Sequence, residues 1–509
     1  MSSRSKYLLI IIFLSSVIYA NTLKNEFVSD DVPAIKNNPR ISEIFSAREF
    51  VGFTYSLNYL IGKLNPVYYH LTNIFLHSLN SILVFFFLCL FFKPYPSFFG
   101  ALIFAAHPIH TEAVTWIAGR PYVLMALFFL CSFFLYLRAT SQDKLRLFIF
   151  FASLVVYYLC LCYATIFGFV FPAMVILYDF TFGRWRKNWK LWLIFLIIAA
   201  TRLFLILGTI KQRIADVAVD IGRSQPGNPL FNMAFSIFTH LRLLIWPQNL
   251  TLYHEPVTTS ISILILEILL LVTLILCLPL IFKKAKVLFF AICIYILFLT
   301  PTYSPKVISW LIAERYLYFP SIALSMFAAF FVQKQSVAVR KLHGRYVEVE
   351  KSKKLLNVIL IVLVALYSWR TIVRNTDWRT HASIWRATAK VSPYSPRAHN
   401  NMGDVYSLEG NPQLAVLEFR RAIELRPDYA DAYHNLATTY YNMGRVQEAI
   451  ENYKKAISFN SKLYQSYVSL GGVYFNMGRL AQAKEYLLKA QELKPDDPSL
   501  KQILQDINK

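Results

Sequence analysis

Two adjacent carboxylates are the residues best suited to chemistry. Asp30 and Asp31 directly follow the short segment Phe27-Val28-Ser29, which comes after the first apolar stretch. Neighbouring carboxylates repel each other, so one of them tends to hold a proton or bind a cation unless a partner neutralises it. That property suits a general base. The alternative is a solvated acidic turn or a helix cap before Pro33, which would be preferred if the pair stood alone.

A second set of polar residues follows one face of an expected helix, at Tyr69, His70, Asn73, His77 and Asn80. Their spacing of three, four and three residues places them in one row. A polar seam that joins neighbouring helices explains His77 and Asn80 without any ligand. His70, nearer the outer end, is the candidate for substrate binding.

The third set is His107-Pro108-Ile109-His110-Thr111-Glu112, continuing to Arg120. Two histidines and a glutamate could ligate a metal, but Pro108 interrupts the helix on which they would converge, and the spacing is not that of a zinc site. A broken helix lining a polar cavity fits better. There His107, His110 and Glu112 would bind substrate, and Arg120 would suit a phosphate.

The fourth set is divided between two places in the chain. Tyr253, His254 and Glu255 lie in an expected outer loop, and Glu314 precedes Arg315 at the start of an apolar segment. These are further candidates for substrate binding. A Glu beside an Arg is often only a salt bridge that holds two helices in register.

Basic residues on the expected outer side suggest an anionic ligand. The rule that Lys and Arg gather in cytoplasmic loops gives no reason for them there. A bound polyanionic head group would explain their presence there. We expect it to contact Arg120, Arg202, Lys306 and Arg315.

The composition is that of a membrane protein. The chain has 509 residues, 56% hydrophobic and only 16% charged, and carries a net charge of +23. A soluble domain is about 45–50% apolar and about a quarter charged. Of the net charge, +19 belongs to the first 373 residues. We therefore interpret the basic residues as cytoplasmic loop charge and expect no nucleic-acid partner. The six cysteines all lie in apolar runs, which implies no disulfide framework.

Eleven apolar segments are candidates for crossing the hydrocarbon core. They are 7–20, 67–92, 97–117, 121–138, 146–162, 164–181, 189–209, 261–282, 287–304, 314–332 and 355–372. With the N-terminus inside, the basic clusters at 184–190, 283–286 and 334–354 become cytoplasmic and the C-terminus lies outside. The apolar segment 231–247 would break this arrangement as a span, so we expect it to be re-entrant or interfacial. Long outer loops are expected from Asn21 to Asn65 and from Lys211 to Ser260.

The C-terminal part repeats itself every 34 residues. Aligned positions include Gly403/Ala437/Gly471, Tyr406/Tyr440/Tyr474 and Ala415/Ala449/Ala483. This is the tetratricopeptide period, which predicts an α-solenoid of about three repeats. We expect an all-α chain with a membrane domain at 1–373, a connecting helix at 374–394 and a repeat domain at 395–509. Such repeats commonly hold a peptide, but they could also only stabilise one another.

Four segments, in order, resemble one known family. FVSDDVPAIKNNP, the stretch from Tyr68 to His77, HPIHTEAVTWIAGR and AERYLYFPS are similar to the transmembrane-and-tetratricopeptide-repeat protein O-mannosyltransferases, within the GT-C glycosyltransferase fold. The resemblance covers nearly the whole chain. It departs at Pro121-Tyr122, where the family usually has a small residue and then Asp, so any role of that Asp is unsupported here.

The resemblance implies transfer of a sugar, mannose or a related hexose, from a polyprenyl-phosphate carrier to Ser/Thr hydroxyls of exported proteins, with inversion. Asp30 or Asp31 would be the base, and Arg/Lys would stabilise the phosphate leaving group. We expect no obligatory cofactor, although the paired carboxylates leave a divalent cation open. The site and the repeats would face the extracytoplasmic side. Two alternatives remain: a membrane-anchored scaffold for envelope assembly, and a transporter of lipid-linked sugars.

Overall fold

The computed structural model describes residues 2–43, 50–141, 145–163, 166–221, 229–254, 260–303, 310–337, 341–342, 345–346, 350–495 and 497–507. Almost all regular structure there is helical, which confirms the all-α prediction. The exceptions are β1 (Lys341–Leu342) and β2 (Arg345–Tyr346), which pair antiparallel. The chain forms two compact units, a membrane unit (Met1–Leu252 and Thr259–Ser383) and a repeat unit (Tyr253–Thr258 and Ile384–Lys509).

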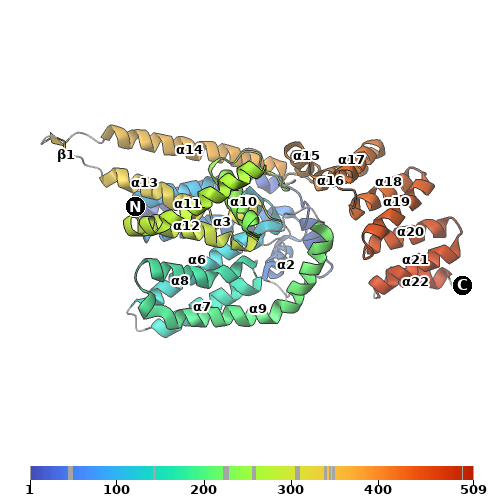
Figure 1. Cartoon of the computed structure of the whole chain (residues 1–509), viewed down its shortest axis with the longest axis horizontal. Helices are drawn as coiled ribbons and strands as arrows, with labels where there is room; N and C mark the ends of the chain where they lie inside the picture. Colours follow the sequence, from blue (N-terminus) through green and yellow to red (C-terminus); the bar gives the residue numbers. More distant parts are fainter. Residues whose placement is uncertain are drawn as a thin grey trace. The chain divides into compact units, whose positions relative to one another are not determined.

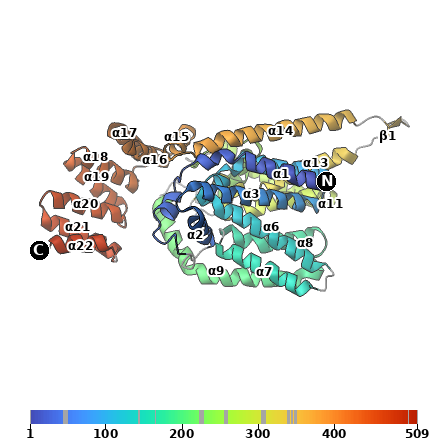
Figure 2. The same cartoon turned by 180° about the vertical axis from the view of Figure 1, so that it is seen from behind.

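The membrane unit contains α1 to α14 (Figure 1). Their bounds are α1 (Ser3–Val17), α2 (Phe50–Gly62), α3 (Pro66–Cys89), α4 (Pro94–Ala106), α5 (Thr111–Val114), α6 (Arg120–Thr140), α7 (Arg146–Tyr163), α8 (Phe171–Thr181), α9 (Trp185–Ile221), α10 (Pro229–Ile245), α11 (Ile261–Lys284), α12 (Lys286–Phe298), α13 (Ile322–Val337) and α14 (Glu350–Asp377). Helix α3 packs against α1, α4 and α6, and Figure 2 shows α1, α3 and α6 as neighbours.

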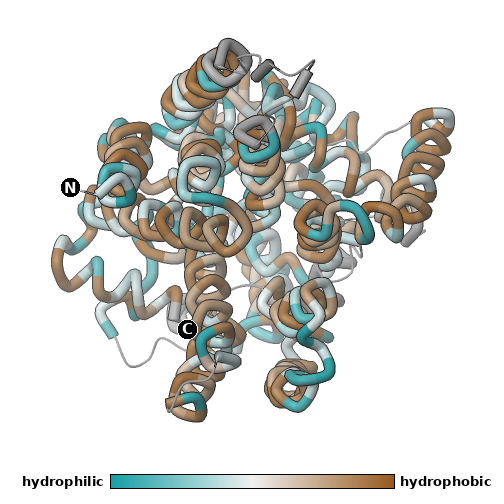
Figure 3. The backbone as a smooth tube through the Cα atoms, turned by 90° about the vertical axis from the view of Figure 1, so that its left-hand side faces the viewer, coloured by the Kyte–Doolittle hydropathy of each residue, from teal (hydrophilic) through white to brown (hydrophobic). Residues whose placement is uncertain are grey.

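Six segments of the described chain are long and apolar enough to cross a membrane. They are Ser3–Lys24, Pro66–Cys89, Ile117–Thr140, Trp185–Lys211, Ile261–Lys284 and Leu355–Asp377. Only 6% of the α11 window and 11% of the α9 window are buried, and Figure 3 shows hydrophobic residues along the outer faces of several helices. Apolar surface of this extent requires lipid. Six further apolar helices are 10–17 residues long, so the number and direction of the crossings remain predictions.

Two expected spans are interrupted in the structure. In the apolar segment 97–117 the first helix ends at Ala106, because Pro108 starts the 3-10 turn η3 (Pro108–His110), and only the short helix α5 follows. The expected span 314–332 was also wrong at its start. There the chain forms the 3-10 turn η8 (Glu314–Leu317), and α13 begins only at Ile322. Both breaks leave polar backbone inside the unit, where it must find partners.

The expected outer loop from Lys211 to Ser260 is partly helical. Helix α9 continues to Ile221, well past the predicted end of its span. The segment expected to be re-entrant forms α10, one of the shorter apolar helices. Its residues His240 and Asn232 are buried, so α10 packs within the unit. Its relation to the membrane remains a prediction.

The repeat unit consists of the connecting helix α15, three helix pairs and a last single helix (Figure 1). The bounds are α15 (His381–Val391), α16 (Pro396–Leu408), α17 (Pro412–Leu425), α18 (Ala430–Asn442), α19 (Val446–Phe459), α20 (Tyr464–Asn476), α21 (Leu480–Leu493) and α22 (Pro498–Ile507). The connecting helix expected within 374–394 starts only at His381, because α14 continues to Asp377 and Thr380 and Ser383 cap α15 reciprocally.

Small residues explain how each helix pair forms. A Cβ at Gly403 would lie 2.4 Å from the Phe419 ring, so only glycine allows α16 to approach α17 this closely. Between paired helices, Gly410, Gly444 and Gly478 all adopt φ of +72° to +76°, a conformation that glycine takes without strain.

Candidate functional site

The Asp30-Asp31 pair lies in a tight turn after the first long helix. Ser29 has φ of +52°, a left-handed conformation that is uncommon outside glycine and that marks a constrained turn. Asp31 is fully buried. One of its carboxylate oxygens accepts from the Val28 N–H at 3.1 Å, and the other from the Ala118 N–H at 2.7 Å. This residue therefore joins the turn to the segment after α5, 87 positions further on.

The two carboxylates differ in environment. Burial, opposed by the two backbone N–H groups, raises the pKa of Asp31 to about 7. Asp30 is exposed to solvent, although protein atoms surround much of its carboxylate. Burial raises its pKa too, while the positive charge of Arg315 acts in the opposite direction. Asp30 therefore lies within electrostatic reach of Arg315 and is accessible to solvent. Asp31 is buried and has no access to solvent.

Glu112 and Arg315 form an ion pair in the interior. One Glu112 oxygen accepts from the Arg315 backbone N–H at 2.8 Å, and the other pairs with the Arg315 guanidinium. Glu112 is 1% exposed and Arg315 is 8% exposed. Charged groups are buried at this level only when they are paired and hydrogen-bonded. The breaks at Pro108 and at η8 are what allow these two residues to meet.

Three aromatic rings surround the Arg315 guanidinium. Its central carbon lies 5.6 Å from the ring centre of Trp116, 6.0 Å from that of Tyr122 and 5.1 Å from that of Tyr316. Such rings stabilise a cation electrostatically and fix the direction in which it points. Arg315 is thus a positioned cation within electrostatic reach of Asp30, a carboxylate that solvent can reach.

A second set of charges supports this pair. Glu314, fully buried, accepts from the Thr251 N–H at 2.5 Å, and one of its oxygens lies 3.5 Å from a guanidinium nitrogen of Arg374. Arg374 also pairs with Asp377 at 2.8 Å. The end of α14 is therefore fixed to η8. This favours a positioning role for Glu314 over its expected contact with substrate.

Arg120 is held almost entirely by protein groups. Its guanidinium donates to the side-chain oxygens of Asn73 at 2.7 Å, Thr54 at 2.9 Å and Asn58 at 2.8 Å, and to the Tyr69 carbonyl at 3.0 Å. It also lies over the Tyr55 ring at 4.6 Å. Four of its five donors are thus engaged by the protein. This geometry favours structural positioning over the expected phosphate contact.

The histidines lie in the helix interface rather than in one open site. His107 Nε2 lies 2.8 Å from the Leu244 carbonyl, His110 Nε2 lies 2.8 Å from the Ser321 hydroxyl, and His70 Nε2 lies 3.2 Å from the Asn25 carbonyl. All three are buried. His77 and Asn80 both contact the Tyr318 hydroxyl, as a polar seam would.

The remaining predicted residues lie in other elements or outside the described residues. Tyr253 belongs to the repeat unit, where its ring stacks on Trp385 at 5.5 Å and its carbonyl accepts from Ser392; His254 lies in the same unit. Arg202 lies within α9. Glu255 and Lys306 lie outside the described residues.

Sequence reasoning missed several residues that hold the site. Trp116 and Tyr122 face Arg315, Arg374 pairs with Glu314, and Asn375 donates to the Ile18 carbonyl while accepting from Thr115. Arg374 and Asn375 carried a usable signal, because polar groups at the end of a membrane helix are costly unless paired. Within the described residues, no group of three His, Cys, Asp or Glu could hold a metal ion.

Relatives of known name were found for most of the chain. It is 26% identical over 490 residues to the human "Protein O-mannosyl-transferase TMTC3", covering 83% of this chain and 52% of the relative. It is 26% identical to "Protein O-mannosyl-transferase F38B6.6" of Caenorhabditis elegans, with 63% of that protein covered. A shorter match, 38% over 154 residues, is to human "Protein O-mannosyl-transferase TMTC1". The chain spans about half the length of the human relative it matches first.

The repeats are matched separately. Tetratricopeptide-repeat family models cover residues 394–462 and 464–497, which confirms the prediction from the 34-residue period. Among solved structures, the crystal structure of MamA is 28% identical over 28% of this chain and 84% of that chain, but the TM-score of 0.22 supports no argument. The chain is therefore a homologue of proteins named protein O-mannosyl-transferases and ends in tetratricopeptide repeats.

Proposed function

We propose that this protein is a membrane glycosyltransferase that moves a hexose from a polyprenyl-phosphate carrier to Ser/Thr hydroxyls of exported proteins. The observation that carries the proposal is the solvent-accessible Asp30 within electrostatic reach of Arg315, a cation held by Glu112. This transfer requires a base for the acceptor hydroxyl and a cation for the phosphate leaving group. The names of the relatives support the reaction class.

The proposed step is a single displacement. Asp30 takes the proton of the acceptor hydroxyl as its oxygen forms a bond to the sugar C1, and the bond from C1 to the phosphate oxygen breaks. The phosphate departs with the electron pair, and Arg315 stabilises its charge. Attack from the face opposite to the phosphate inverts C1. Asp31 is the positioning residue that fixes the turn through Val28 and Ala118.

The test uses the full chain in lipid nanodiscs with a polyprenyl-phosphate mannose donor and Ser/Thr peptides, and measures glycosylated peptide by mass spectrometry. Asp30→Asn should lower transfer by about 10²–10⁴-fold, the usual contribution of a general base. Asp428→Asn, an exposed repeat carboxylate, is the matched control. Transfer that persists in a folded Asp30→Asn variant would contradict the role of Asp30. Lipid movement without any peptide product in the unmodified chain would favour a transporter.

A further inference from the structure

A groove lies on the lipid-facing side of the membrane unit, away from the Asp30 turn. It encloses about 530 Å³, within the roughly 300–1,000 Å³ of typical ligand pockets. Its lining residues are Arg4, Leu83, Phe85, Phe86, Cys89, Leu90 and Phe134. All but Arg4 are apolar or weakly polar, so the groove is suited to a hydrocarbon chain with one charged contact.

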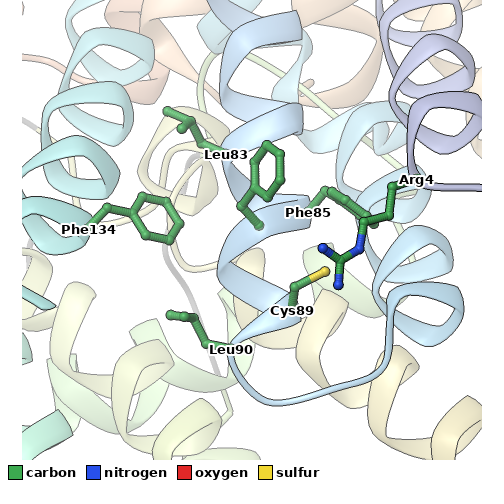
Figure 4. A pocket seen from close by; sticks show the side chains of 7 residues that line it. Arg4, Leu83, Phe85, Cys89, Leu90 and Phe134 are labelled. Carbon is green, nitrogen blue, oxygen red and sulfur yellow. The ribbon is translucent and has the colours of Figure 1, made fainter. Parts of the chain in front are cut away.

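Three helices form the groove. Helix α3 provides its floor, with Arg4 of α1 on one side and Phe134 of α6 on the other (Figure 4). Phe86 and Leu90 on the floor are 42% and 43% exposed, so the groove opens outward. In a bilayer a lipid must fill it, because an unfilled apolar surface loses its dispersion contacts.

The charge at this end of the unit is positive. Lys93 follows Cys89 by four residues, and Arg138 follows Phe134 by one helical turn. None of α1, α3 and α6 contains an Asp or Glu. The helices that form the groove therefore offer cations to a bound anion and no carboxylate to repel it.

We propose that this groove binds an anionic phospholipid, with an acyl chain over Leu83 and Phe86 and the phosphate on Arg4. The sugar donor does not fit as the occupant. Arg4 lies in the first turn of α1, and Asp30 follows the other end of that helix. With 15 residues at about 1.5 Å each, α1 separates them by roughly 20 Å. The groove is thus a resident lipid site independent of the proposed transfer.

The test measures which lipid stays bound to the full chain. The protein is reconstituted in vesicles of equal phosphatidylglycerol and phosphatidylcholine, extracted in mild detergent and analysed by native mass spectrometry. We expect one retained phosphatidylglycerol. Arg4→Gln should reduce its retention about fivefold, the ratio that about 1 kcal/mol for one basic residue near an anionic surface gives.

Two further variants distinguish the groove from general surface charge. Leu90→Trp fills the groove and should displace the lipid while leaving Arg4 in place. Arg186→Gln removes an exposed basic residue on α9 and should retain the lipid as the unmodified chain does. Equal retention by all three variants would overturn the proposal, as would a groove that retains polyprenyl phosphate in preference when both lipids are supplied.

Discussion

The two units use charge in opposite ways. In the membrane unit the ion pair of Glu112 and Arg315 is buried and joins residues 203 positions apart. In the repeat unit, pairs such as Arg421 with Glu424 lie three residues apart on one helix and are 45% and 64% exposed. The first kind determines which distant segments meet. The second adds little to a helix that already forms.

This contrast separates two sources of stability. The repeat unit depends on local periodicity, because each helix pair packs small residues against a neighbour at the same spacing, as Ala415, Ala449 and Ala483 do. The candidate site depends on a few long-range polar contacts in a low-dielectric interior, where an unpaired charge is costly. The same chemical change should therefore have very different effects in the two units.

The largest effect is expected from neutralising the buried pair. Glu112→Gln leaves Arg315 buried without its counter-charge, which costs about 3–5 kcal/mol, and it should also abolish most transfer. Glu424→Gln removes an exposed pair worth less than about 1 kcal/mol. Thermal unfolding of the full chain in detergent measures both variants.

The conservative variant Glu112→Asp addresses the case in which Glu112→Gln does not fold. It keeps the charge with a shorter side chain, so it should recover part of the stability but not full transfer. If Glu112→Gln and Glu424→Gln shift the unfolding temperature equally, the contrast between the units is wrong.

The tetratricopeptide repeats could be predicted from the sequence, because their contacts recur at a fixed spacing of 34 residues. The sequence also indicated several residues of the candidate site. Asp30 was named as one of two adjacent carboxylates, Glu112 as part of a broken helix, and Arg315 as a basic residue on the expected outer side. The contacts between these residues could not be predicted, because nothing in a linear pattern relates Glu112 to Arg315 or Asp31 to Ala118. The roles of Arg120 and Glu314 depend on partners such as Asn58 and Arg374, which carry no motif.

A second, smaller effect is expected in the pH dependence of stability. The pKa of Asp31 is raised to about 7 by burial, against 3.8 for the unperturbed group. Between these values the folded chain holds a proton that the unfolded chain releases. Stability should therefore be highest at low pH and fall as pH rises through 7, by up to about 4 kcal/mol.

Asp31→Asn should remove that slope, as measured by unfolding temperature at pH 5 and pH 8. Asp404 is the comparison in the repeat unit, since burial first and Asp431 second raise its pKa to about 7 as well. Asp404→Asn should change the pH dependence of stability only for the repeat helices. An unchanged slope in the Asp31→Asn variant would contradict a protonated Asp31.

The smallest effect tests whether local packing really governs the repeat unit. Gly471 and Gly472 are neighbours on α20, yet a Cβ at Gly471 would lie 2.7 Å from Leu487 Cγ, and one at Gly472 would meet nothing within 4 Å. Leu487 is 1% exposed, so it has little room to move. Gly471→Ala should cost about 1–3 kcal/mol by overpacking.

Gly472→Ala should instead stabilise α20 by about 0.5–1 kcal/mol, because alanine restricts the unfolded backbone without a clash. Amide hydrogen exchange in α20 of the full chain measures both changes, and neither should alter exchange in α3. Opposite signs at adjacent positions can come only from the contact that each Cβ would make. The same sign at both would mean that helix propensity, rather than the fit of Gly471 against Leu487, determines how the repeats pack.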